Sequence, residues 1–151
     1  MADYSTLHGK RFLDSHALEA PRVVRLLAMT SERLDGEGGA VKAIMRYRDA
    51  SGEGEMVWAL TNSILAAALF GAVDNGDPSR PVREVERWMG RLVAIHRDPS
   101  VRFGPETVGG VRVYGSPELA APVVVSVQVT RKRKPQQVTL HPVPMPTRTG
   151  A

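Results

Sequence analysis

The sequence predicts a mainly β protein: a five-stranded barrel with a helix between strands three and four, a second short helix and C-terminal strand extensions. Two observations lead to this fold class. Short apolar segments rich in β-branched residues recur along the chain, separated by connections that contain glycine or proline. One stretch alone, "WALTNSILAAALFG" (58–71), changes from a strand-like pattern to an alanine- and leucine-rich one. The length of 151 residues suits one domain with a sizeable core.

Three strands are expected before that stretch. The first is "PRVVRLLAMT" (21–30), which is apolar and β-branched and follows a proline. After a turn at 35–39, the alternating segment "VKAIMRYR" (41–48) predicts the second strand. The segment 49–55 contains two glycines and predicts a hairpin connection, and 56–60 is expected to form the third strand.

The helix is expected over residues 61–71. Thr61, Asn62 or Ser63 can cap its start, because their side-chain oxygens accept hydrogen bonds from the free N–H groups of the first turn. Gly71 is expected to end it in the left-handed conformation. Such a short, apolar, capped helix is suited to closing one end of a barrel.

The second half of the chain is expected to supply one short helix and the remaining strands. "RPVREVERWMG" (80–90) has a proline near its start, a glycine at its end and an apolar stripe, which predicts a helix with Trp88 in the core. Further strands are expected at 91–97, at 101–103 with 110–115, and at 121–130.

Three strands, a helix and two more strands form the layout of the OB-fold, a five-stranded Greek-key barrel. A generic α+β sheet with one packed helix has the same order, and the order alone leaves both open. We expect a single domain over residues 1–141. Residues 142–151 are rich in proline and are expected to form a disordered tail.

Composition limits the classes of function. The chain has no cysteine, which excludes disulfides and thiol catalysis and fits a reducing compartment. The N-terminus has no apolar stretch that resembles a signal peptide, and no apolar run is long enough to span a bilayer. Four scattered histidines match no metal or hydrolase motif. We therefore expect no catalytic residues, no metal and no cofactor, and a cytoplasmic protein with no membrane partner.

A net charge of +4 favours a polyanionic partner, although such a charge is also ordinary for a soluble protein. Single-strand binders combine cations that contact phosphates with aromatic rings on which bases stack. Alternation in 41–48 places Lys42, Arg46 and Arg48 on one face and Met45 and Tyr47 on the other. The expected nucleic-acid-binding residues are these three cations together with Trp58, Arg112, Tyr114, Arg131, Lys132, Arg133 and Lys134.

Each of these residues also has a plain structural interpretation. The cations of the segment 41–48 could form a solvated outer face, and Trp58 could belong to the core. The run 131–134 could be a solvated tail instead of an arm that grips phosphates. These alternatives are open at the level of the sequence.

Several short motifs occur in a characteristic order. They are "GKRFL" (9–13), "TNSILAAALFG" (61–71), "WMGRLVAIH" (88–96), "VRFGPETVGGVRVYGSPEL" (101–119) and "RKRKPQQVTL" (131–140). In this order and spacing the chain resembles a family of small phage and prophage proteins that are similar to single-stranded DNA-binding OB proteins. The acidic insert at 74–86 is longer than this resemblance leads us to expect.

The resemblance implies a non-sequence-specific, single-stranded DNA-binding protein of phage replication or recombination, located in the cytoplasm of the bacterial host. The implied partners are single-stranded DNA, phage replication or recombination proteins, and further copies of the chain in a homo-oligomer. The alternative is a non-enzymatic protein-interaction or assembly module on the same barrel, which the low aromatic content of 5% favours.

Overall fold

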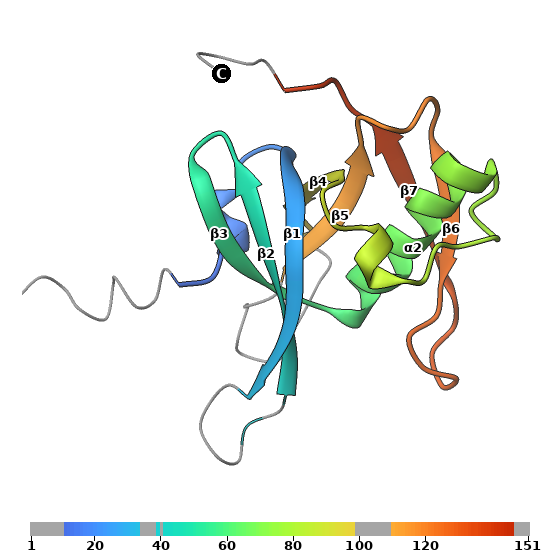
Figure 1. Ribbon diagram of the computed structural model, residues 1–151. Helices are drawn as coiled ribbons and strands as arrows, with labels where there is room; N and C mark the ends of the chain where they lie inside the picture. Colours follow the sequence, from blue (N-terminus) through green and yellow to red (C-terminus); the bar gives the residue numbers. More distant parts are fainter. Residues whose placement is uncertain (1–10, 34–38, 40, 99–109, 147–151) are drawn as a thin grey trace, which may run out of the picture.

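The computed structural model describes residues 11–33, 39, 41–98 and 110–146 (Figure 1). This part of the chain contains a seven-stranded mixed sheet, one α-helix and two short 3-10 turns. The strands are β1 (Arg22–Arg33), β2 (Val41–Asp49), β3 (Gly52–Trp58), β4 (Leu92–Arg97), β5 (Val111–Ser116), β6 (Val123–Val127) and β7 (Gln136–Pro142). The helical elements are η1 (Ser15–Ala17), α2 (Leu60–Asn75) and η2 (Val85–Arg87). The predicted mainly β fold is confirmed.

The strand order in the sheet is β3-β2-β1-β4-β5-β7-β6. Neighbouring strands pair antiparallel except β5 and β7, which are parallel. The sheet curves so that β3 comes close to β5, although they are four places apart in the order. Among the described residues no ladder joins these two strands. The sheet is therefore not closed, and a five-stranded barrel is not confirmed.

The edge of β5 that faces away from β4 is already occupied. Val111 and Val113 are two residues apart, so their backbone polar groups point to the same edge. The Asn62 side chain binds both: its Nδ2 donates to the Val111 carbonyl at 3.0 Å, and its Oδ1 accepts from the Val113 N–H at 2.9 Å. Further along, Gly115 pairs with His141 of β7. With these groups paired, β5 offers β3 little backbone to bind.

The helix α2 lies between β3 and β4 in the chain, as predicted, but is longer than expected. It continues through Gly71 and ends at Gly76, which has the left-handed φ of 70°. Gly71 is buried inside the helix, where a Cβ would meet the backbone of Arg80 and Pro81. The predicted cap was also wrong, because the N-cap is Ala59 and it makes no side-chain hydrogen bond. Asn62 lies inside the helix and is used for the contact with β5.

The helix predicted at 80–90 is reduced to the short turn η2. Backbone groups that would form the hydrogen bonds of a helix bind partners outside the segment instead. The Val82 N–H donates to the Ala67 carbonyl of α2 at 2.9 Å. The Trp88 indole Nε1 donates to the Val82 carbonyl at 2.7 Å, and Trp88 is buried as predicted. The segment is therefore held against α2 by these contacts instead of by its own helical bonds.

The strands expected at 21–30, 41–48, 91–97, 110–115 and 121–130 are all present, with shifted ends. The third strand begins at Gly52, four residues before the prediction, so the hairpin connection after β2 is tighter than expected. The strand β7 was not individually predicted. The segment 101–103 and most of the turn at 35–39 lie outside the described residues. No helix in the described part of the chain is long and apolar enough to cross a membrane.

Candidate functional site

The predicted cationic face of β2 exists, and two of its three cations are paired with one carboxylate. Lys42, Arg46 and Arg48 are all exposed. The register of the β2–β3 hairpin places Glu53 opposite Arg48. Glu53 accepts from Arg46 at 2.8 Å and from Arg48 at 2.7 Å, and these hydrogen bonds hold the pKa of its carboxyl below the ordinary value. Two of the three cations thus already have an anionic partner within the hairpin.

Trp58, predicted as a stacking platform, is part of the core. Its side chain is only 3% exposed, and its indole Nε1 donates to the Ser63 hydroxyl at 2.9 Å. The tryptophan ends β3 against the first turn of α2, so burial follows from the tight connection between these two elements. The sequence analysis proposed Trp58 as a ring on which bases stack, and this proposal is wrong, because stacking needs an open aromatic face. Tyr47, on the opposite face from the β2 cations, is also buried.

Arg112 lies on β5 opposite His96 of β4 and is only 9% exposed. Its Nη1 donates to the Val111 carbonyl at 3.1 Å. Burial lowers the pKa of the guanidinium, and the negative charge of Asp98 acts against this lowering. A buried cation with five donors is a strong attractor for an anion, because the surroundings screen its charge weakly.

Tyr114 is half-buried and lies between two imidazoles. Its ring stacks on His141 of β7 with centroids 4.7 Å apart and planes at 24°, and it makes a tilted contact with His96 at 4.8 Å. The two-residue period of a strand puts Tyr114 on the same face of β5 as Arg112. The ring therefore shares a face with Arg112, but two histidine rings already contact it.

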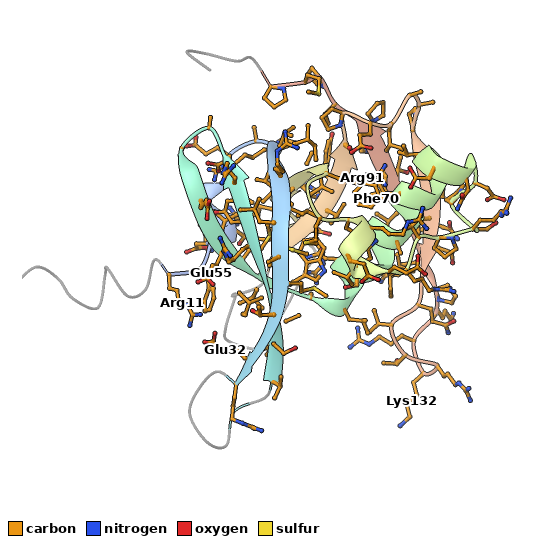
Figure 2. The ribbon with its side chains drawn as sticks, viewed as in Figure 1. Arg11, Glu32, Glu55, Phe70, Arg91 and Lys132 are labelled. Atoms are coloured by element: carbon orange, nitrogen blue, oxygen red, sulfur yellow. The ribbon has the colours of Figure 1, made fainter. Side chains whose placement is uncertain are left out.

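The basic run 131–134 is the loop of a β6–β7 hairpin, not the start of a free tail. All four side chains are exposed, and Lys132 projects away from the body of the protein (Figure 2). The loop is shaped by two hydrogen bonds. The Arg133 N–H donates to the Thr130 carbonyl at 3.2 Å, and Gln128 Nε2 donates to the Arg133 carbonyl at 3.0 Å. This correction follows from β7, which returns along β6 and fixes both ends of the loop.

A groove of about 570 Å³ brings three of the predicted residues together. It runs between the start of α2, the paired strands β4 and β5, and the β6–β7 hairpin. Its charged and polar lining includes Arg112, Arg133, Lys134, His96, Asp98 and Gln136. Leu65, Val113, Val127, Val129 and Val138 supply the apolar part. We call this space the hairpin groove.

Three cations against one carboxylate give the hairpin groove a positive balance. The cations differ in kind, because Arg112 is fixed and buried while Arg133 and Lys134 are exposed on the loop. His96 is the one aromatic ring among the described residues that line the groove. This combination of cations, apolar surface and a flat ring suits an anionic ligand with a planar apolar part.

The hairpin groove also contains residues that the sequence analysis did not assign to the site, namely His96, Asp98 and Gln136. Burial lowers the pKa of His96, Asp98 opposes this effect, and His141 and Arg112 add to it. The signal for His96 and Asp98 was present, since they are two residues apart at the end of a predicted strand. Their proximity to Arg112 could not be predicted from the sequence, because it depends on the register between β4 and β5.

Other predicted residues do not line the groove. Arg131 and Lys132 are in the same hairpin loop, and the β2 cations are separated from β5 by β1 and β4 in the sheet. Within the part of the chain that the structure describes, no three His, Asp or Glu residues are grouped so that they could hold a metal ion.

Comparison with known proteins gives no relative for this chain: no family model, curated protein or solved structure matches it.

Proposed function

We propose that this protein binds single-stranded DNA with little sequence preference, and that the hairpin groove and its basic loop form the binding surface. The observation that carries the proposal is the convergence of Arg112, Arg133 and Lys134 on one groove. Single-strand binders combine a cationic groove that follows the backbone with aromatic rings on which the bases stack. The hairpin groove supplies the cations and one ring, His96, and Arg131 and Lys132 extend its cationic side.

The finer fold proposal is an open variant of the OB-like barrel. It is supported by the order β3-β2-β1-β4-β5, by α2 between β3 and β4, and by the approach of β3 to β5. In OB-folds the face of strands two and three and the loops beside it bind single strands. Here Arg46 and Arg48 of that face are already paired with Glu53, so we place the main contact on the opposite part of the sheet. The resemblance to phage proteins supports a role of this binding in replication or recombination.

The test is a fluorescence anisotropy titration with labelled oligo-dT at two salt concentrations, with unlabelled duplex of the same length as competitor. We expect oligo-dT to bind, the affinity to fall with added salt, and duplex to compete poorly, because paired bases cannot enter the groove. Equal competition by duplex would reduce the effect to general charge attraction and would count against the proposal.

The second candidate is a protein-interaction module that uses the same basic loop for an acidic partner. The burial of Trp58 and the histidine contacts of Tyr114 favour it, because they leave little aromatic surface for bases. Poly-glutamate is a suitable competitor in the same titration. If it displaced oligo-dT at equal charge concentration, this candidate would be preferred.

A further inference from the structure

The strand β6 ends the sheet and leaves one edge without a neighbouring strand in the described structure. Its sequence, Val123 to Val127, is V-V-V-S-V. Val125 and Val127 are buried on the inner face, whereas Val124 is 59% exposed and Ser126 is exposed on the outer face. An exposed edge strand presents unpaired N–H and C=O groups that can pair with another strand.

The opposite edge of the sheet, formed by β3, is protected against pairing with another strand, whereas the β6 edge is not. β3 contains the charged residues Glu53 and Glu55 and two glycines. The Leu13 N–H donates to the Glu55 carbonyl at 2.8 Å, and Arg11 forms an ion pair with the Glu55 side chain. Charges and a covering segment are devices that prevent edge-to-edge pairing. β6 has no charged residue, no glycine and no proline within its five positions.

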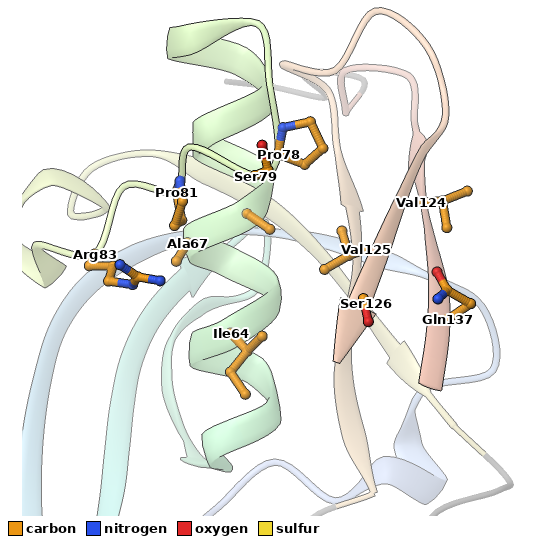
Figure 3. A pocket seen from close by; sticks show the side chains of 11 residues that line it. Ile64, Ala67, Pro78, Ser79, Pro81, Arg83, Val124, Val125, Ser126 and Gln137 are labelled. Atoms are coloured by element: carbon orange, nitrogen blue, oxygen red, sulfur yellow. The ribbon is translucent and has the colours of Figure 1, made fainter. Parts of the chain in front are cut away.

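A groove of about 450 Å³, lined mainly by apolar residues and also by Arg83, runs beside β6 and leaves room at this edge (Figure 3). Ile64 and Ala67 of α2, with Pro78 and Pro81 of the following segment, form one side. Val124 to Ser126 form the other. The combination of an unpaired edge and an adjacent apolar space is what strand addition requires.

We propose that β6 is a self-association site, where a second copy of the chain pairs its own β6 antiparallel across a two-fold axis at Val125. The strand is suited to this partner. Pairing about Val125 sets Val123 opposite Val127 of the other copy and Val124 opposite Ser126, so inner faces meet inner faces. The result is one continuous sheet through both copies.

The charge distribution favours the antiparallel arrangement. β6 leads through residues 128–130 into the basic loop 131–134 of the hairpin. In an antiparallel pair the two basic loops lie at opposite ends of the joint, about 16 Å apart or more for five residues of strand. A parallel pair would set eight like charges side by side. The joint rests on one short strand per copy, so we expect a dimer that dissociates on dilution.

The test measures self-association of the full chain without nucleic acid, so its outcome is independent of the proposed function. Sedimentation velocity from about 10 µM to about 500 µM should show a monomer–dimer equilibrium. Val124→Lys places a lysine on the edge and should raise the dimer Kd by about tenfold or more. Val41→Lys is the matched control, because Val41 is equally exposed at 57% and lies on β2; it should leave the Kd within about twofold.

The register is tested by cross-linking, which is clean because the chain has no cysteine. The double variant Val124→Cys, Ser126→Cys should form a covalent dimer on mild oxidation, because each new thiol faces one of the partner's. Either substitution alone should cross-link much less. A chain that stays monomeric throughout the range, equal weakening by the two lysine variants, or a double variant that fails to cross-link would each overturn the proposal.

Discussion

The side chain of Asn62 pairs with the backbone of Val113 as a neighbouring strand would. Its Oδ1 accepts from the Val113 N–H at 2.9 Å while its Nδ2 donates to the Val111 carbonyl at 3.0 Å, and the residue is fully buried. One amide thus satisfies a donor and an acceptor at the place where β3 and β5 approach without a ladder. The first turn of α2 is thereby attached to β5, beside the hairpin groove.

Replacing Asn62 with Ala should destabilise the fold strongly. The substitution leaves the buried Val113 N–H without a partner, which costs about 1–3 kcal/mol, while the Val111 carbonyl still accepts from Arg112. We expect the free energy of unfolding in urea to fall by about 1–3 kcal/mol. Thr61→Ala is the control, because Thr61 is adjacent and only half-buried. Equal losses in the two variants would mean that the bridge to β5 contributes nothing specific.

Asn62 also shows where prediction from the sequence ends. Asparagine before an apolar run is typical of a helix cap, and the sequence supported that interpretation. Its real partners are about 50 residues away on β5. Gly71 was misassigned for the same kind of reason, because a glycine that admits a neighbouring backbone looks in sequence like one that ends a helix. Local pattern located the helix, and tertiary contacts set its ends.

The candidate site was predictable only in its components. Arg112 and the run 131–134 were recognisable as cations, but the run was interpreted as a flexible arm or a solvated tail because β7 was not separately identified. The signal for β7 was there: Val138 and Leu140 alternate with Gln137, Thr139 and His141. Trp58 could not be placed because "MVWAL" is apolar throughout and gives no alternation between faces.

Arg91 should make stability depend on pH in the acid range. Its guanidinium lies over the Phe70 ring at 4.1 Å (Figure 2) and donates to Asp74 and Glu118 at 2.8 and 2.6 Å. The hydrogen bonds from Arg91 hold the pKa of Asp74 below its ordinary value of 3.8. Because the folded state lowers this pKa, its contribution to stability is complete above that value and is lost as the pH falls through the folded-state pKa.

The variant Arg91→Met keeps much of the apolar contact with Phe70 and removes the charged hydrogen bonds. We expect it to lower the free energy of unfolding by about 1–3 kcal/mol at pH 7 and by less at pH 3. Chemical denaturation across this range measures both values. A loss that is the same at pH 7 and pH 3 would show that Asp74 is not coupled to Arg91.

His96 should also make the stability fall as the pH is lowered, but in a higher pH range than Asp74. Burial on β4 lowers its pKa below the ordinary 6.5, and the groups that face it are Asp98, Arg112 of β5 and His141 of β7. Below pH 6.5 the unfolded chain takes up a proton that the folded chain refuses, so the free energy of unfolding should fall until the folded-state pKa is reached. His96→Gln should flatten the stability profile in the range just below pH 6.5. A profile that keeps its slope would contradict a half-buried His96 with a lowered pKa.

The carboxylate of Glu53 decides whether the β2 face takes part in binding. Glu53→Gln removes the anion that pairs with Arg46 and Arg48. If DNA contacts the hairpin groove alone, the affinity for oligo-dT should change by no more than about twofold, because exposed pairs contribute little at a distance. An increase of about tenfold would instead show that phosphates compete with Glu53 for these arginines, and would move the binding surface to β2.

The basic loop gives the most direct test of the binding surface. If Arg131, Lys132, Arg133 and Lys134 each contact a phosphate, the log–log dependence of affinity on salt has a slope of about −0.7 per contact. Changing all four to Ala should therefore flatten the slope by up to about 3 units. The exposed loop buries little, so the unfolding transition should stay within about 0.5 kcal/mol of the wild type. The paired control is Arg46→Ala with Arg48→Ala, which removes two exposed cations from β2 and should leave the slope unchanged. Loss of slope in this control, with none in the loop variant, would place the phosphates on β2 and leave the hairpin as a solvated loop.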